Sequence, residues 1–229
     1  VATELGLERR IASALSYARH PLVYLVEAAD DICYQIMDIE DAAKLHILSR
    51  EEAQGLLSAF FSEEELWEVQ QGLRHIADPN EQTAYLRSKV INLLVEEAAG
   101  IFLDAEQAIL AGTFSGSLIH HLEPRTKAAY EACSQTAYAR IYRAREVVDV
   151  ELAGHRIFTA LLDQLLEAQL HPDYQYRRTL LSRVSSQYEM GQSSMYGRIQ
   201  STLDYISGMT DIYALDLYRR ITGMNLPAV

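Results

Sequence analysis

Residues 27 to 41 read EAADDICYQIMDIED, a stretch with the periodicity of an α-helix and several acids. Asp30, Tyr34 and Asp38 stand four residues apart, so in a helix they form one polar stripe on one face. The apolar face beside this stripe is formed by Leu25, Ile32, Ile36 and Ile39. A helix that presents a carboxylate, a phenol and a second carboxylate in line is suited to holding a metal ion and a hydroxylated ligand. A solvated acidic face explains the same spacing equally well.

The rest of the chain also has a helical pattern, and no run alternates polar and apolar residues as a strand does. Ser49 and Ser62, each followed by glutamates, mark two helix starts. The other helices are expected at about 3–18, 21–48, 81–110, 125 onward, 146–170, 177–189, 193–206 and 209–221. We find no repeat and no domain boundary. The sequence therefore predicts an all-α, multi-helix assembly that spans residues 1–229 as a single helical domain.

Composition narrows the class of protein. Apolar residues make up 49% and charged residues 23% of the 229, which is typical of a soluble globular protein. No charge-free run reaches the roughly 18 apolar residues of a membrane-spanning helix, so no membrane partner is expected. Cys33 and Cys133 are the only cysteines, which indicates reduced thiols in a cytoplasmic protein. The formal charge of −12 repels polyanions, so a triphosphate ligand would need a metal and locally placed Arg or Lys.

Two segments resemble one enzyme family. Residues 20–42, HPLVYLVEAADDICYQIMDIEDA, are similar to a metal-ligand helix of the HD-superfamily deoxynucleoside triphosphate triphosphohydrolases, the dGTPase-like family. Residues 204–223, DYISGMTDIYALDLYRRITG, resemble the closing helix of that family. The resemblance implies an HD-domain-type fold and a metal-dependent enzyme. It further implies that a dNTP, with dGTP favoured, is hydrolysed to a deoxynucleoside and tripolyphosphate.

The resemblance also implies roles for the polar stripe. The metal site of the family uses a His, a His-Asp dipeptide and a distant Asp, and Asp30 matches that last Asp, with Asp31 as its competitor. Such oxygen and imidazole ligands suit a divalent ion, Mg or Mn first, with Fe, Ni or Zn as further candidates. Asp38 would accept a hydrogen bond from the 3′-hydroxyl of the substrate sugar. Tyr34 would pack on the sugar and donate to a phosphate, although a core tyrosine is an equally good explanation.

Residues 83–89, TAYLRSK, are placed beside the triphosphate by the same resemblance. Tyr85 and Lys89 share one helix face, and Arg87 lies roughly 160° around the helix from Tyr85. Lys89 or Arg87 would contact the phosphates, with bidentate geometry for Arg and a point charge for Lys. An exposed basic turn is equally consistent with this segment.

Three other motifs have mainly structural explanations. His120 and His121 are adjacent, so they point about 100° apart on a helix and are expected as a surface or capping pair. Gly208 is expected to break a helix and Thr210 to cap the next one. Residues 138–145, YARIYRAR, combine two tyrosines with three arginines, which suits a regulatory nucleotide or single-stranded DNA as a ligand. Acidic residues follow at once, so a strip packed against acidic neighbours is favoured.

The chain departs from the family in one respect. None of its seven histidines is followed by Asp, so three of the four metal ligands have no counterpart. We favour a C-terminal portion of a larger HD-domain enzyme, because Val1 is not a start residue and the stripe is intact. The alternatives are a catalytically inactive helical scaffold for nucleotide binding or oligomerisation, and an HD phosphohydrolase for another nucleotide. The family resemblance also implies a homo-oligomer.

Overall fold

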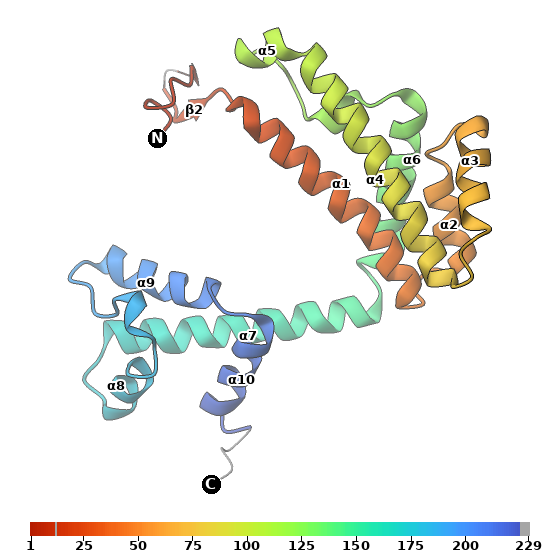
Figure 1. Cartoon of the computed structure of the whole chain (residues 1–229). Helices are drawn as coiled ribbons and strands as arrows, with labels where there is room; N and C mark the ends of the chain where they lie inside the picture. The colour runs from red at the N-terminus through yellow and green to blue at the C-terminus, as the bar shows by residue number, and fades with distance from the viewer. Residues whose placement is uncertain (12, 225–229) are drawn as a thin grey trace. The chain divides into compact units, whose positions relative to one another are not determined.

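The computed structural model describes residues 1–11 and 13–224, and its chain forms two compact units, Val1–Ala144 and a second that begins at Arg145 (Figure 1). Within the described residues the regular structure is helical, apart from one two-stranded hairpin. The all-α class predicted from the sequence is therefore confirmed. The extent of a single domain over residues 1–229 stays a prediction, and the two units are described separately below.

The helix predicted over residues 3–18 is wrong. Strand β1 (Arg9–Ile11) pairs with strand β2 (Ser16–Tyr17) as an antiparallel hairpin, and Ala12 between them lies outside the described residues. Gly6 adopts a φ of 68°, which a right-handed helix does not allow. The Arg10 guanidinium also donates to the carbonyl oxygen of Gly112 over 2.7 Å. Contacts with a distant segment thus override the local helical pattern.

Two long helices form the frame of the first unit. Its helices are α1 (Pro21–Lys44), α2 (Arg50–Ser58), α3 (Glu63–Leu73), α4 (Pro79–Asp104), α5 (Glu106–Leu110) and α6 (Pro124–Thr136), with a 3₁₀ turn η1 (Leu118–His121). Helices α1 and α4 lie side by side, α2 packs on both, and α3 packs on α4 (Figure 1). Helix α6 packs against α1 and α2.

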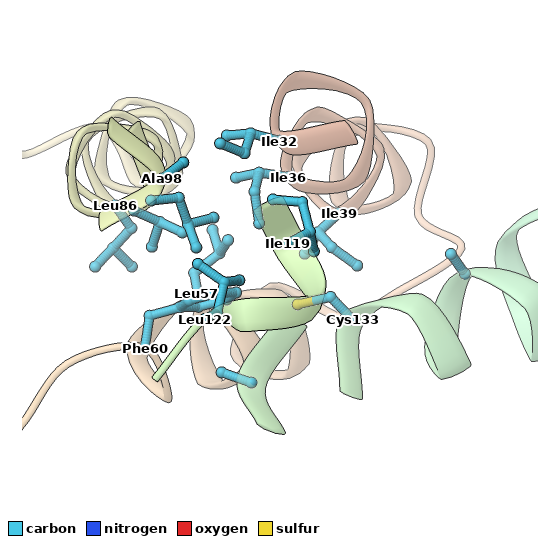
Figure 2. Packing of buried hydrophobic residues seen from close by; sticks show 14 of the residues in the cluster. Ile32, Ile36, Ile39, Leu57, Phe60, Leu86, Ala98, Ile119, Leu122 and Cys133 are labelled. Carbon is cyan, nitrogen blue, oxygen red and sulfur yellow. The ribbon is translucent and has the colours of Figure 1, made fainter. Parts of the chain in front are cut away.

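The core of the first unit lies between these helices. Figure 2 shows apolar side chains that converge from α1, α2, α4, η1 and α6, among them Ile32, Ile36, Ile39, Leu57, Leu86, Ile119 and Cys133. Ile36 and Leu57 are fully buried, and burial of a side chain of this size stabilises the fold by about 1.5–3 kcal/mol. This packing fixes which face of α1 points inward.

The ends of the helices follow local signals closely. Ser49 and Ser62 each form a capping box, with Glu52 and Glu65 as reciprocal partners, as their sequence predicts. Helix α1 ends at Lys44 instead of about residue 48, because His46 adopts a φ of 59°. The helix predicted over 81–110 is two helices, α4 and α5, joined at Ala105.

A π-helix, η2 (Ala137–Ile141), continues α6, and the Tyr142 amide closes it by donating to the carbonyl oxygen of Ala137 over 3.0 Å. Single π-turns within a helix are uncommon and occur frequently at functional sites. A π-turn holds one more residue than an α-helical turn, so it shifts the helical register of the residues that follow it, Tyr142 first.

In the second unit, three helices pack on one long helix. Its elements are α7 (Arg145–Leu170), α8 (Gln175–Leu181), the 3₁₀ turn η3 (Ser186–Tyr188), α9 (Met195–Ser207) and α10 (Asp211–Ile221). Helices α8, α9 and α10 all contact α7 (Figure 1). The helix predicted over 177–189 is therefore a shorter helix followed by a separate turn. Among the described residues, no helix has the length and apolar character needed to cross a membrane.

Candidate functional site

Helix α1 has a buried face and an outer face. His20 caps its start, because the imidazole accepts a hydrogen bond from the Leu22 amide, and Pro21 occupies the first turn. Ile32, Ile36 and Ile39 are buried, as the sequence predicts. Asp30 and Tyr34 are exposed, Tyr34 to 68%, since they lie roughly half a turn away from Ile32.

The predicted apolar face is wrong at Leu25, because 37% of the surface of this residue is exposed. The first turns of α1 pack on the side of Tyr24, whose ring meets the ring of Phe114 edge-on at 5.2 Å between centroids. The Tyr24 hydroxyl also donates to the carbonyl oxygen of Phe114 over 3.2 Å. Leu25 points about 100° away from this contact and is left partly uncovered.

The outer face of α1 lines an open cavity of about 950 Å³. Its lining residues all come from α1 and include Asp30, Cys33, Tyr34 and Asp38. The remaining lining residues are mainly apolar, among them Leu22, Val23, Val26, Ala29 and Met37. The predicted stripe thus lies on an apolar surface, which the sequence analysis missed. The signal was available, because Leu22, Val23, Val26 and Met37 stand in the same helix outside the predicted apolar face.

Asp38 has a partner that sequence reasoning did not assign to it. The Tyr142 hydroxyl donates to Asp38 Oδ2 over 2.6 Å, and the Tyr142 ring meets the Tyr138 ring edge-on at 5.4 Å between centroids. Burial first, and then this hydrogen bond, raise the pKa of Tyr142 above its ordinary value. Tyr142 is therefore a protonated donor that fixes the orientation of the Asp38 carboxylate.

Asp31 lies beside a different cavity from Asp30. This cavity, of about 560 Å³, is also lined by Arg19, Glu27 and His120. Burial first, and then the charges of Glu27 and Asp30, raise the pKa of Asp31, while His120 acts in the opposite direction. Asp30 and Asp31, the two candidates for the metal ligand, therefore line different cavities.

The basic residues of α4 do not line the α1 cavity. Arg87 Nη1 lies 2.6 Å from Oε2 of the buried Glu40, and Lys44 Nζ lies 2.9 Å from Oε1 of the same carboxylate. Glu40 is two residues after Asp38, which places it roughly 160° away around α1. Arg87 therefore pairs with a different face of α1 from the one that carries Asp38.

Tyr85 and Lys89 are together on another face of α4. The Lys89 ammonium lies 5.5 Å from the centroid of the Tyr85 ring. Tyr85 packs so closely on α3 that a Cβ at Gly72 would clash with the Tyr85 hydroxyl oxygen. The assignment of Tyr85, Arg87 and Lys89 to substrate phosphates stays a prediction.

The described residues do not form a complete metal site. No group of three or more His, Cys, Asp or Glu side chains in this part of the chain is arranged to hold a metal ion. Asp30 contributes one carboxylate, which by itself does not fit the ligand set of a bound metal. His120 and His121 are exposed, in line with the predicted surface or capping pair: Ser117 N–H donates to His120 Nδ1 over 3.2 Å, and His121 Nε2 lies 3.0 Å from the Ser115 carbonyl oxygen.

Comparison with known proteins shows which protein family this chain resembles. Residues 120–220 match the model of the phosphohydrolase-associated domain. A deoxyguanosinetriphosphate triphosphohydrolase-like protein of Pseudomonas aeruginosa is 32% identical over 218 residues, which cover 93% of this chain and 49% of the relative. A protein of the same description from Synechocystis is 33% identical over 239 residues, covering 99% of this chain and 50% of the relative.

A deoxyguanosinetriphosphate triphosphohydrolase of Yersinia enterocolitica is 27% identical over 256 residues, covering 93% of this chain and 50% of the relative. The predicted resemblance to the dGTPase-like triphosphohydrolase family is therefore confirmed. The chain spans about half the length of the curated relatives that it matches.

Proposed function

We propose that this chain forms part of the active site of a deoxynucleoside triphosphate triphosphohydrolase, with the outer face of α1 as one wall. The observation that carries the proposal is the α1 cavity, which presents Asp30, Tyr34 and Asp38 in line on a mainly apolar surface. The relatives carry the name of a dGTP triphosphohydrolase, which supports a dNTP as the substrate class and dGTP as the first candidate.

In this proposal Asp30 is one ligand of a divalent metal ion, Mg or Mn first. Such an ion supplies neutralisation of charge on the phosphates when it is bound. The described residues do not complete the ligand set, so this proposal assigns only Asp30 to the ion.

Tyr34 and Asp38 would hold the sugar end of the substrate. Asp38 Oδ2 already accepts from Tyr142, so Oδ1 is the oxygen left for a sugar hydroxyl. Tyr34 is mostly exposed and would offer a ring face to the sugar and a hydroxyl to a phosphate. In the reaction, a water oxygen bonds to the α-phosphorus, the bond from that phosphorus to O5′ breaks, and O5′ takes a proton. The products are a deoxynucleoside and tripolyphosphate.

Phosphorus NMR of the native full-length gene product with dGTP and Mn tests this function. Tripolyphosphate is expected with the native protein and with Asp31→Asn, whereas Asp30→Asn is expected to produce none. The two variants are matched, because they remove the same charge from adjacent residues that line different cavities. If dGTP stays intact with the native protein, or if Asp30→Asn remains active, the proposal fails.

A scaffold that binds nucleotide or assembles into oligomers is the second candidate. It is favoured by the exposed apolar side chains of α1, such as Val26 and Met37, since such patches mark interaction surfaces. A scaffold needs no metal, so metal analysis of the native gene product separates it from both hydrolase functions. Trials with other nucleotides then separate a dNTP enzyme from an HD phosphohydrolase of different specificity. A cytoplasmic homo-oligomer remains part of the proposal.

A further inference from the structure

A separate cavity of about 400 Å³ lies within the second unit. It is found where the residues after α8, the turn η3 and the connection between α9 and α10 meet, and it is lined by Arg183, Ser185, Tyr188, Tyr205, Met209 and Tyr213, among others. None of its lining residues is acidic. This is notable in a chain with 32 acidic and 20 basic residues.

Arg183 gives the cavity a positive charge that no carboxylate pairs with directly among the described residues. Within the described residues, its guanidinium forms neither an ion pair nor a hydrogen bond, unlike Arg177, which pairs with Glu167 on the same unit. Its charge reaches the neighbouring Tyr205 phenol: burial is the largest effect and raises the pKa of Tyr205, whereas Arg183 lowers it. An unpaired guanidinium beside neutral hydroxyls favours an anionic ligand.

A pair of phenols adds a hydrogen-bond donor. The hydroxyl oxygens of Tyr205 and Tyr213 lie 3.1 Å apart, so one hydroxyl proton is used between them and the other is left for an acceptor. Tyr205 is only 5% exposed, whereas Tyr213 is 46% exposed. The outer hydroxyl, that of Tyr213, is therefore the one that can turn its proton toward a ligand in the cavity.

An aromatic wall completes the cavity. The rings of Tyr188 and Tyr205 lie 5.2 Å apart between centroids. The Tyr188 hydroxyl comes close to Gly208, which also lines the cavity, because a Cβ at Gly208 would lie 2.6 Å from the hydroxyl oxygen. Met209 adds an apolar side chain to this wall.

We propose that this cavity binds a small oxyanion, a phosphate or a carboxylate, carried on an aromatic or other apolar body. Arg183 binds the charge, the free phenol proton and the Ser185 hydroxyl donate to the anion oxygens, and the aromatic wall packs against the apolar body. The cavity shares no residue with the α1 site, so this inference is independent of the proposed function.

NMR titration of the full ¹⁵N-labelled chain tests the proposal, with the Gly208 backbone amide as the local reporter. The probes are phenyl phosphate, benzoate and, as the uncharged control, phenol. At least one anion is expected to shift the Gly208 signal, whereas phenol at the same concentration leaves it unchanged. The tighter of the two anions identifies a phosphate or a carboxylate as the preferred group.

Variants test whether the anions bind in this cavity or are attracted to positively charged side chains in general. Arg183→Gln is expected to weaken binding roughly tenfold or more, and Tyr213→Phe about two- to tenfold. Arg219→Gln removes the same charge from an exposed position on α10 and is expected to bind like the native chain. The proposal is overturned if neither anion moves the Gly208 signal up to about 10 mM. It is also overturned if Arg183→Gln binds as tightly as the native chain.

Discussion

The hydroxyl of Tyr142 donates to Oδ2 of Asp38 over 2.6 Å, and this bond joins the end of a π-helix to the outer face of α1. The two residues are 104 positions apart in the chain. The bond holds one oxygen of Asp38 in a fixed orientation and leaves the other free. The orientation of the Asp38 carboxylate therefore depends on tertiary structure, because Tyr142 lies outside α1.

Replacement of Tyr142 by Phe removes this bond and keeps the ring. The free energy of unfolding is expected to fall by about 0.5–1.5 kcal/mol, because one intramolecular hydrogen bond is lost. Urea titration measures the change. Tyr138→Phe is the matched control, since Tyr138 is largely exposed and its hydroxyl forms no hydrogen bond within the described residues. Equal stability of the two variants would show that the bond to Asp38 contributes nothing.

Replacement of Arg87 by Met tests whether this residue has a structural role. Glu40 is buried, and without Arg87 only Lys44 remains to compensate its charge. We expect the free energy of unfolding to fall by about 1–3 kcal/mol. Lys89→Met, on the exposed side of the same helix, is expected to change it by less than about 0.5 kcal/mol. If Arg87→Met is as stable as the native chain, the predicted phosphate contact becomes the better explanation for Arg87.

The contribution of Glu52 to stability is expected to depend on pH. The ion pair with Arg140, and then the hydrogen bond from the Ser49 amide, lower the pKa of Glu52 from its ordinary value of 4.5 to about 2. Because the folded-state pKa is the lower one, the stabilisation is complete above about pH 5 and is lost as the pH falls toward 2.

Urea midpoints of the native chain and of Glu52→Gln should therefore differ most at neutral pH and converge near pH 2 to 3. Glu51→Gln removes a charge from the same helix turn without breaking this cap, and it provides the control. A difference between native chain and Glu52→Gln that is constant with pH would contradict the assigned role of the charge.

The sequence predicts the local features of this fold best. The capping boxes at Ser49 and Ser62 involve residues three positions apart, and both were predicted correctly. The N-terminal hairpin was missed, because the contact of Arg10 with Gly112 spans 102 positions. The same limit applies to the candidate site: the stripe on α1 follows from periodicity, whereas the partner of Asp38 and the pairing of Arg87 with Glu40 depend on packing between helices.

Gly208 shows a related limit. The sequence predicts a glycine that breaks a helix, yet its φ of −79° is accessible to any residue. The actual constraint is the Tyr188 hydroxyl oxygen, which would lie 2.6 Å from a Cβ at this position. Gly208→Ala is expected to lower the free energy of unfolding by about 1–3 kcal/mol.

The double variant Gly208→Ala, Tyr188→Phe separates a clash from a backbone effect. Removal of the hydroxyl leaves the nearest Tyr188 atom, Cζ, at 3.6 Å, so most of the lost stability should return. Thermal unfolding of Gly208→Ala, of Tyr188→Phe and of the double variant beside the native chain measures this. If the double variant is no more stable than Gly208→Ala, the close contact does not explain the glycine.

The central claim is that the outer face of α1 lines the substrate site, and Cys33 provides a probe of it. Cys33 is exposed and lines the α1 cavity, whereas Cys133 is buried, which raises the pKa of its thiol to about 12. Maleimide should therefore label Cys33 and leave Cys133 unmodified in the folded protein.

The measurement is the rate of maleimide labelling of Cys33 in the native full-length gene product, with and without dGTP and Mn. It is quantified by mass spectrometry of the tryptic peptide 20–44, which contains Cys33. We predict that dGTP slows labelling roughly tenfold or more, and that Asp30→Asn abolishes this protection. Labelling of Cys33 at the same rate with saturating dGTP would contradict the account, because the substrate would then bind away from α1.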